Sequence, residues 1–206
     1  NYAQEVVENE LNSTSDNPII NHEENSVLHG GNFHGDYISI EMDKVKIVIT
    51  KLTMLMERQL NYLLNDRLNK KFPPFLNAAK FGLNFGYQGL QFTATSTTAE
   101  NQTLSAPMSI HSISNNNDNQ DVVSMGTNSA LITKKVIENS FQVISIHIMA
   151  ICQAIDLLTS EEKEKLSSKT LKLYNLIRTK VDFLTSDRVM SGEISSVIEL
   201  LKETTL

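Results

Sequence analysis

Apolar residues recur every three or four positions through most of this chain, which is the spacing of helices with one buried face. The clearest example lies between residues 37 and 65, where the apolar positions are Ile40, Ile47, Val48, Leu52, Leu55, Met56, Leu60 and Leu63. We predict one long helix here. We expect Pro73 and Pro74 to prevent its continuation, because proline lacks the backbone N–H that a helix interior requires.

The same spacing predicts helices near both ends of the chain and through its second half. We expect them over residues 2–11, 85–105, 121–158, 161–181 and 192–204. The first ends before Pro18, because the residue before a proline disfavours the helical conformation. The helix over 121–158 is apolar on several faces, which is typical of a helix buried on several sides in an oligomeric bundle. The predicted fold class is all-α, a bundle of long helices.

Two polar segments interrupt this pattern, at residues 12–36 and 112–121. The first contains "NSTSDNPII" and "HGGNFHGDY", and we predict a long loop with short extended pieces. The second contains five amide and two carboxylate side chains between residues 115 and 121. One such residue suffices to cap a helix, so the run indicates a polar linker or a dense hydrogen-bonding surface. We expect Asp118 or Asn119 to cap the long helix that follows.

Composition bounds the class of protein without defining a reaction. The chain has 206 residues, of which 40% are apolar and 20% charged, as in packed globular proteins. Its net charge of −6 gives no electrostatic reason to expect nucleic acid or an anionic membrane as partner. The single Cys152 favours a reducing, cytoplasmic compartment. Because the chain starts without methionine and within a helical pattern, we expect residues 1–206 to be one portion of a larger protein.

Common catalytic motifs are missing from the sequence. It contains no HExxH, no paired cysteines, no Walker-type glycine loop and no GxSxG. The five histidines lack metal-ligand spacing, so we expect no metal. His147 stands on an apolar helix, where a core role is more common than a ligand role. The residues alone indicate a helical scaffold with a polar pocket.

Several motifs, in consistent order over residues 1–160, resemble the C-terminal part of the aromatic amino acid lyases, which are the histidine, phenylalanine and tyrosine ammonia-lyases. They are "NSTSDNPII", "LHGGNFHGDYISIEMD", "FPPFLN", "NFGYQGLQFTATSTTAENQTLSAPMSIHS", "NNNDNQDVVSMG" and "AICQAIDL". The resemblance implies the C-terminal segment of the ammonia-lyase fold and a homotetramer. It implies elimination of ammonia from an aromatic amino acid to give an α,β-unsaturated acid, and is closest in character to bacterial tyrosine ammonia-lyases.

The electrophile of that family is a methylidene-imidazolone, which forms from an internal Ala-Ser-Gly. This chain contains no Ala-Ser-Gly, because its one Ser-Gly pair, Ser191–Gly192, follows Met190. The resemblance therefore places the electrophile, the tyrosine base and the arginine that binds the substrate carboxylate in a missing N-terminal part. No catalytic residue is expected in this chain, and we expect the chain alone to be inactive.

The resemblance implies that six residues line the substrate or electrophile pocket: Asn17, Phe33, Gln88, Asn116, Asn119 and Gln120. Asn17 matches an asparagine close to the electrophile and to the amino-acid end of the substrate, and Phe33 matches an aromatic residue beside it. Asn116 and Asn119 match pocket positions of tyrosine-type members. Without the resemblance, Asn17 reads as a turn residue, Phe33 as an ordinary core residue and the other amides as surface or capping residues.

Positions 88 and 120 vary with substrate class in the family. Histidine-specific members typically have methionine and glutamate there, and plant phenylalanine members have lysine and glutamine. Gln88 and Gln120 are neutral amides, which suit an uncharged ring with a phenolic hydroxyl. Tyrosine is therefore the favoured substrate, with histidine as the close alternative and phenylalanine left open. Two further classes stay open: an aminomutase, which shares the electrophile, and a helical assembly module without catalysis.

Overall fold

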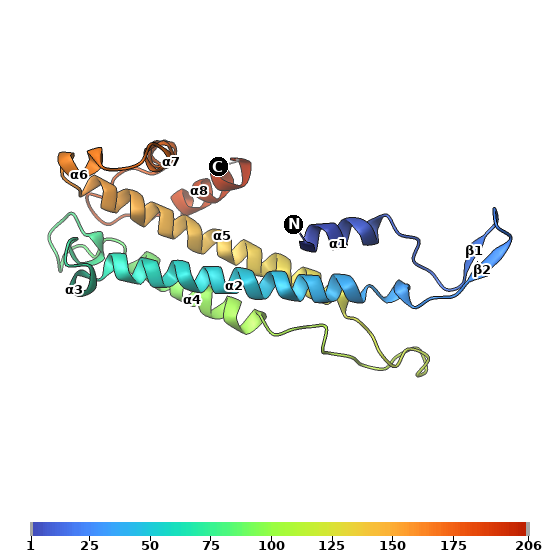
Figure 1. The fold of residues 1–206 in the computed structure, drawn as a ribbon. Helices are drawn as coiled ribbons and strands as arrows, with labels where there is room; N and C mark the ends of the chain where they lie inside the picture. The colour runs from blue at the N-terminus through green and yellow to red at the C-terminus, as the bar shows by residue number, and fades with distance from the viewer. Residues whose placement is uncertain (1, 205–206) are drawn as a thin grey trace. The chain divides into compact units, whose positions relative to one another are not determined.

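The computed structural model describes residues 2–204, which are mostly helical (Figure 1). The helices are α1 (Tyr2–Leu11), α2 (Asp36–Leu64), α3 (Asp66–Asn69), α4 (Gln88–Leu104), α5 (Gly126–Asp156), α6 (Ser160–Glu164), α7 (Ser168–Arg178) and α8 (Ser191–Glu203). Two 3-10 turns, η1 (Asn32–His34) and η2 (Pro74–Leu76), and two strands, β1 (Ile19–Asn21) and β2 (Ser26–Leu28), complete the described elements. The strands form one antiparallel hairpin in which Ile20 pairs with Val27. The prediction of an all-α protein is confirmed.

Apolar periodicity located most of the long helices. The helix predicted over 37–65 is α2, which ends at Leu64, well before Pro73. The helices predicted over 2–11 and 192–204 are α1 and α8. The helix predicted over 85–105 is α4, which begins later, at Gln88, because the preceding Gly86 has a left-handed backbone with φ of 57°.

The start predicted for the longest helix is wrong. We expected it at residue 121, whereas α5 begins at Gly126. Residues 121–125 are not helical, since the N–H of Val123 donates to the hydroxyl of Ser112 over 2.9 Å and Met125 has a φ of 54°. A positive φ is incompatible with a right-handed helix, so the helix starts after Met125.

The single helix predicted over 161–181 is also wrong, because the structure divides it into α6 and α7. Thr159 caps α6 in a reciprocal arrangement in which Glu162 bonds back to the cap. Ser167 starts a second helix by accepting a hydrogen bond from the N–H of Thr170. Two strong caps eight residues apart favour two short helices over one long one.

The chain forms two compact units, and each contains part of α2 and part of α5. The first unit comprises residues 1–50 and 102–137, and the second comprises residues 51–101 and 138–206. None of the helices within residues 2–204 is long and apolar enough to cross a membrane.

The second unit has a hydrophobic core. Most of its buried residues come from α2, α4, α5, α7 and α8, and they include Leu60, Leu64, Leu90, Val143, Ile146, Met149, Ile177, Ile194 and Val197. Tyr87 is fully buried, and its hydroxyl donates to the carbonyl of Met149 over 3.3 Å. This core fixes the start of α4.

The first unit is held largely by polar contacts. Its buried residues include Ser39, Asp43, Lys46, Ser129 and Thr133. The hydroxyl of Thr133 donates to the carbonyl of Met42 over 2.9 Å and thereby ties α5 to α2. These contacts place the two polar segments that the sequence marked.

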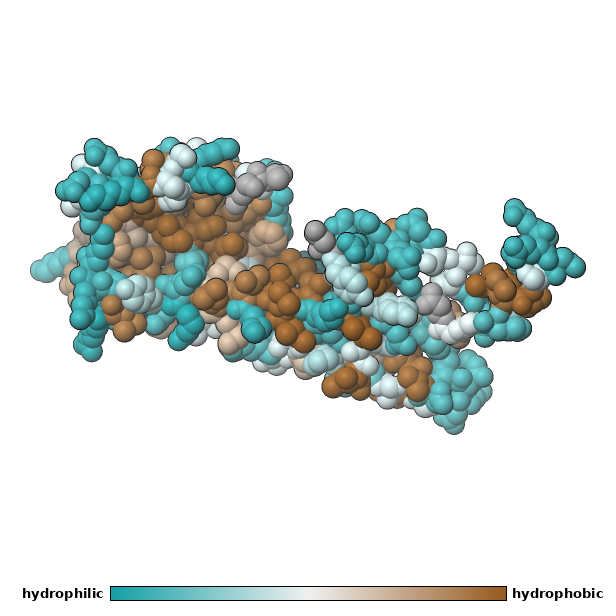
Figure 2. Space-filling model, viewed as in Figure 1, coloured by the Kyte–Doolittle hydropathy of each residue, from teal (hydrophilic) through white to brown (hydrophobic). Residues whose placement is uncertain are grey.

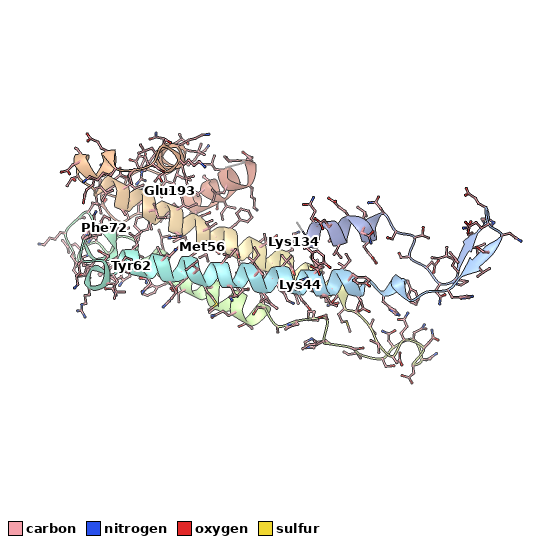
Figure 3. The ribbon with its side chains drawn as sticks, viewed as in Figure 1. Lys44, Met56, Tyr62, Phe72, Lys134 and Glu193 are labelled. Carbon is pink, nitrogen blue, oxygen red and sulfur yellow. The ribbon has the colours of Figure 1, made fainter. Side chains whose placement is uncertain are left out.

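Apolar side chains are exposed along α2. Ile40, Ile47 and Val48 in the first unit are between 38% and 56% exposed, and so are Leu52, Leu55 and Tyr62 in the second. Within each group the helical spacing places the three residues on one face of α2. Figure 2 shows hydrophobic surface, drawn in brown, among the polar teal surface, and Figure 3 labels Met56 and Tyr62 on this helix. Such faces are typical of contact surfaces between subunits.

Candidate functional site

Residues 112–123 fold back on themselves and form a loop that we call the amide hairpin. The N–H of Asn115 donates to the carbonyl of Gln120 over 3.1 Å, and the N–H of Gln120 returns a bond of 3.3 Å. Residues 116–118 at the tip have φ between 54° and 62°. Asparagine and aspartate tolerate this left-handed conformation better than other residues with side chains. The tip of the hairpin therefore explains why this segment is rich in these residue types.

The expectation that Asp118 or Asn119 caps the long helix is wrong. Asp118 accepts a hydrogen bond of 2.6 Å from the hydroxyl of Ser114, inside the amide hairpin. The N–H of Asn119 donates to the carbonyl of Asn116 over 3.2 Å. Both residues serve the turn, several positions before α5 begins.

The first turns of α2 hold both ends of the amide hairpin. On the incoming side, the carboxylate of Asp43 accepts the N–H of Met108 over 3.0 Å and the N–H of Ser109 over 2.8 Å. On the outgoing side, the hydroxyl of Ser39 donates to the carbonyl of Ser124 over 2.5 Å. Ser39 and Asp43 are one helical turn apart, so they lie on the same face of α2.

Asp43 is the charged centre of this anchor. It is buried, and its Oδ1 lies 2.7 Å from the Nζ of Lys46, which is fully buried. The hydroxyl of Ser129 donates to the same oxygen over 2.7 Å. Burial alone raises the pKa of Asp43, but the Lys46 ammonium and the N–H groups of Ser109 and Met108 outweigh it and lower the pKa below its ordinary value. The carboxylate is therefore ionised at neutral pH.

The glycine-rich segment at residues 30–35 meets the outgoing end of the amide hairpin. The hydroxyl of Ser124 donates to the carbonyl of His34, and the ring centroids of Phe33 and His34 are 4.3 Å apart. Gly35 has a φ of 68°, which lets the backbone turn into α2. The two polar segments that the sequence marked are thus brought together in the first unit.

The six predicted pocket residues lie on exposed or half-exposed surface. Asn17, Phe33, Asn116 and Asn119 are exposed, and Gln88 and Gln120 are half-buried. Within residues 2–204, the side-chain amides among them make no hydrogen bond, so their donors and acceptors are available to a ligand. Five of the six residues belong to the first unit. Gln88 is the first residue of α4 and belongs to the second.

Ser39, Asp43 and Ser124 are anchoring residues that we did not predict from the sequence. A signal was present, because Ser39, Asp43 and Lys46 stand at positions i, i+4 and i+7 of the helix predicted over 37–65. A polar stripe of this kind is normally a solvated face, whereas here it is buried. No group of three or more histidine, cysteine, aspartate or glutamate side chains suited to a metal ion occurs in the described part of the chain.

The helices, the amide hairpin and the segment with Phe33 together form a helical scaffold that presents neutral amide side chains and one aromatic ring at its surface. Comparison with known proteins identifies the class. Residues 1–179 match the model of the family described as aromatic amino acid lyase. The chain belongs to the aromatic amino acid lyase family.

Relatives with different activities match at similar identity. The tyrosine ammonia-lyase of Cupriavidus metallidurans is 40% identical over 198 residues, which cover 96% of this chain and 37% of the relative. The histidine ammonia-lyase of Natranaerobius thermophilus is 36% identical over 198 residues, which cover 96% of this chain and 38% of that relative. A tyrosine 2,3-aminomutase of Streptomyces globisporus, whose name describes it as dependent on MIO (methylidene-imidazolone), is 39% identical over 200 residues. These residues cover 97% of this chain and 36% of that relative.

The fold comparison agrees with the sequence comparison. A crystal structure of a tyrosine aminomutase from Streptomyces globisporus matches with a TM-score of 0.90 at 39% identity, covering 97% of this chain and 37% of that chain. The chain thus has the fold of a segment of these enzymes. It spans between 36% and 38% of the length of these relatives.

Proposed function

We propose that this chain is the C-terminal portion of an aromatic amino acid ammonia-lyase that converts L-tyrosine into ammonia and an α,β-unsaturated acid. The observation that carries the proposal is the set of neutral amide side chains on the anchored amide hairpin, those of Asn116, Asn119 and Gln120, which make no hydrogen bond within residues 2–204. These amides suit an uncharged aromatic amino acid, because they donate to and accept from groups such as a phenol without adding charge.

Gln88 and Gln120 support tyrosine over histidine. A carboxylate at position 120 would attract an imidazolium ring, whereas an amide offers the same reach without charge. A pocket that hydrogen-bonds a phenol also rejects the analogue that lacks the hydroxyl. Histidine is the second candidate, since the histidine ammonia-lyase relative is nearly as similar as the tyrosine-specific one. An aminomutase is the third, supported by the Streptomyces globisporus relative.

The residues of this chain fit a methylidene-imidazolone electrophile supplied from outside it. The unpaired amide of Asn17 offers N–H donors for a carbonyl of such a group, and the ring of Phe33, 42% exposed, offers an apolar face. When bound, the group supplies an electrophile that draws electrons from the substrate. We assign no proton transfer to this chain. Asn17 orients the reacting end of the substrate, and Phe33 excludes water. Gln88 and Gln120 each offer a neutral amide to a substrate ring.

We also propose that the working enzyme is a cytoplasmic homotetramer that contains the N-terminal part of the fold. The exposed apolar faces of α2 support contact between subunits. The single cysteine, Cys152, is buried and free, which suits a reducing compartment.

The test is a substrate panel on the full-length enzyme. Tyrosine, histidine and phenylalanine are incubated separately, and ammonia and the ultraviolet absorbance of the conjugated acid are measured. We expect the highest kcat/KM with tyrosine and no turnover by residues 1–206 alone. A preference for histidine selects the second candidate, and a β-amino acid product selects the third. No ammonia and no β-amino acid from any of the three contradicts the proposal.

A further inference from the structure

The start of α4 is linked to a residue about a hundred positions later in the chain. The carboxylate of Asp187 accepts the N–H of Phe85 on Oδ2 over 2.8 Å and the N–H of Gly86 on Oδ1 over 3.0 Å. In return, the N–H of Asp187 donates to the side chain of Asn84 over 2.9 Å. These bonds close a ring between residues 84–86 and Asp187, all within the second unit.

The same backbone is fixed from a second direction. The N–H of Tyr87 donates to the carbonyl of Phe75 over 3.0 Å, and a Cβ at Gly86 would lie 2.7 Å from that carbonyl oxygen. Tyr87 is fully buried in the core. Residues 85–87 therefore have little freedom, and Gln88, which follows them directly, takes its direction from their backbone.

The segment that contains Asp187 is itself anchored. The fully buried amide of Gln153 accepts the N–H of Leu184 over 3.0 Å and donates to the carbonyl of the same residue over 3.1 Å. The guanidinium of Arg188 pairs with Glu193 over 2.8 Å, and Figure 3 labels Glu193 on α8. Asp187 thus stands between two fixed points before it contacts the start of α4.

We propose that Asp187 is a positioning residue that fixes residues 85–87 and thereby places the amide of Gln88 against the ring of the substrate. The inference rests on the proposed function and adds to it a residue beyond the range 1–179 that matches the family model. Gln88 needs such support, because its side chain makes no hydrogen bond of its own within residues 2–204. Its position depends on the backbone that precedes it.

The first test is independent of turnover. Asp187→Asn keeps the size of the side chain but leaves one acceptor oxygen for two N–H groups, so one of them loses its partner. Asp182→Asn is the matched control, because Asp182 is an exposed aspartate on the same segment whose carboxylate makes no hydrogen bond in the described structure. Hydrogen-exchange mass spectrometry of the full-length enzyme follows the peptide over residues 80–90. We expect exchange there to accelerate about tenfold in Asp187→Asn and to stay unchanged in Asp182→Asn.

The second test separates positioning of Gln88 from general loosening. The ratio of kcat/KM for tyrosine to that for histidine is measured in the wild type, Asp187→Asn, Gln88→Ala and the double variant. We expect Asp187→Asn to change the ratio about fivefold in the wild-type background and not at all in the Gln88→Ala background. A change only in stability would leave the ratio untouched in both backgrounds.

The outcomes separate the two proposals. Unchanged exchange in Asp187→Asn overturns the inference, and so does a ratio that Asp187→Asn leaves unchanged in the wild-type background or changes equally with and without Gln88. If the wild-type enzyme turns over neither amino acid, the proposed function fails, while the exchange measurement still decides whether Asp187 fixes the start of α4.

Discussion

The hydroxyl of Ser129 donates a hydrogen bond to the carboxylate of Asp43 over 2.7 Å, although the two residues are 86 positions apart in the chain. Ser129 lies in the first turns of α5 and Asp43 in those of α2. The same carboxylate also accepts two backbone N–H groups at the base of the amide hairpin. One buried aspartate therefore joins two helices and one candidate binding loop.

Asp43 and Lys46 form a buried ion pair but differ in their other contacts. Replacing one or the other should therefore lower the free energy of unfolding by different amounts. Asp43→Ala leaves the buried Lys46 ammonium without an opposite charge and should lower the free energy of unfolding by about 3–5 kcal/mol. Lys46→Met should cost less, because Asp43 keeps its N–H and hydroxyl donors. The double variant should be more stable than Asp43→Ala alone. Urea unfolding of the three variants measures this order, with the exposed Asp121→Asn as control, and equal costs for both single variants would contradict it.

The stabilisation by Asp43 should depend on pH in a definite direction. Its pKa is lower in the folded protein than its ordinary value of 3.8, so ionised Asp43 favours folding. That contribution is complete above pH 3.8 and is lost as the pH falls through and below this value. The difference in unfolding free energy between wild type and Asp43→Asn should therefore be constant from pH 7 to about pH 5 and shrink in more acidic solution. Unfolding curves over this range test it, and a difference that grows on acidification would contradict the ion pair.

Two glycines near the start of α4 should respond to alanine in opposite ways. At Gly86 the φ is 57°, and an alanine Cβ would lie 2.7 Å from the carbonyl oxygen of Phe75, so alanine should destabilise the fold by roughly 2–4 kcal/mol. Gly89 lies within α4, and apart from its chain neighbours and the nearby backbone of that helix no atom lies within 4 Å of such a Cβ, so Gly89→Ala should be neutral or stabilising by up to about 1 kcal/mol. Thermal unfolding compares the two variants directly. A tolerated Gly86→Ala would contradict the close packing of residues 75 and 86.

The exposed face of α2 should be required for assembly. Leu55→Lys places a charge on the apolar face that Leu55 shares with Leu52 and Tyr62, and burial of that charge between subunits is unfavourable. We expect light scattering to show a tetramer for the wild-type enzyme and smaller species for Leu55→Lys. Met54→Lys adds the same charge on a different face of the helix and serves as the control. A monomeric wild type at micromolar concentration would contradict the proposed assembly.

The sequence predicted the helices well where apolar periodicity was undisturbed. The stripe through Leu52, Leu60 and Leu63 located α2 to within a residue at either end. The prediction that the longest helix begins at residue 121 was wrong. The positive φ of Met125 and the hydrogen bond between Val123 and Ser112 depend on contacts that a local sequence pattern does not show.

The sequence indicated the side chains of the candidate site, but it did not indicate the residues that hold them in position. Asn116, Asn119 and Gln120 stood out by residue type, and the structure places them on one hairpin. Asp43 and Asp187 did not stand out, because a single aspartate has no signal until the backbone N–H groups that it binds are brought to it by the fold. Anchoring of this kind is a tertiary property.

The central claim is that the amide hairpin lines a pocket for an uncharged aromatic ring, and Gln120→Glu tests it most directly. A carboxylate at this position should favour the imidazole of histidine and disfavour the phenol of tyrosine, because the charge is costly beside a neutral ring in a water-poor pocket. The measurement is kcat/KM for both amino acids in the full-length enzyme, with Gln102→Glu, an exposed glutamine of α4, as the charge-matched control.

We expect Gln120→Glu to shift the ratio of the two kcat/KM values toward histidine by about 1–3 kcal/mol, and Gln102→Glu to leave the ratio unchanged. An active Gln120→Glu enzyme with an unchanged ratio would contradict it, because Gln120 would then not contact the ring.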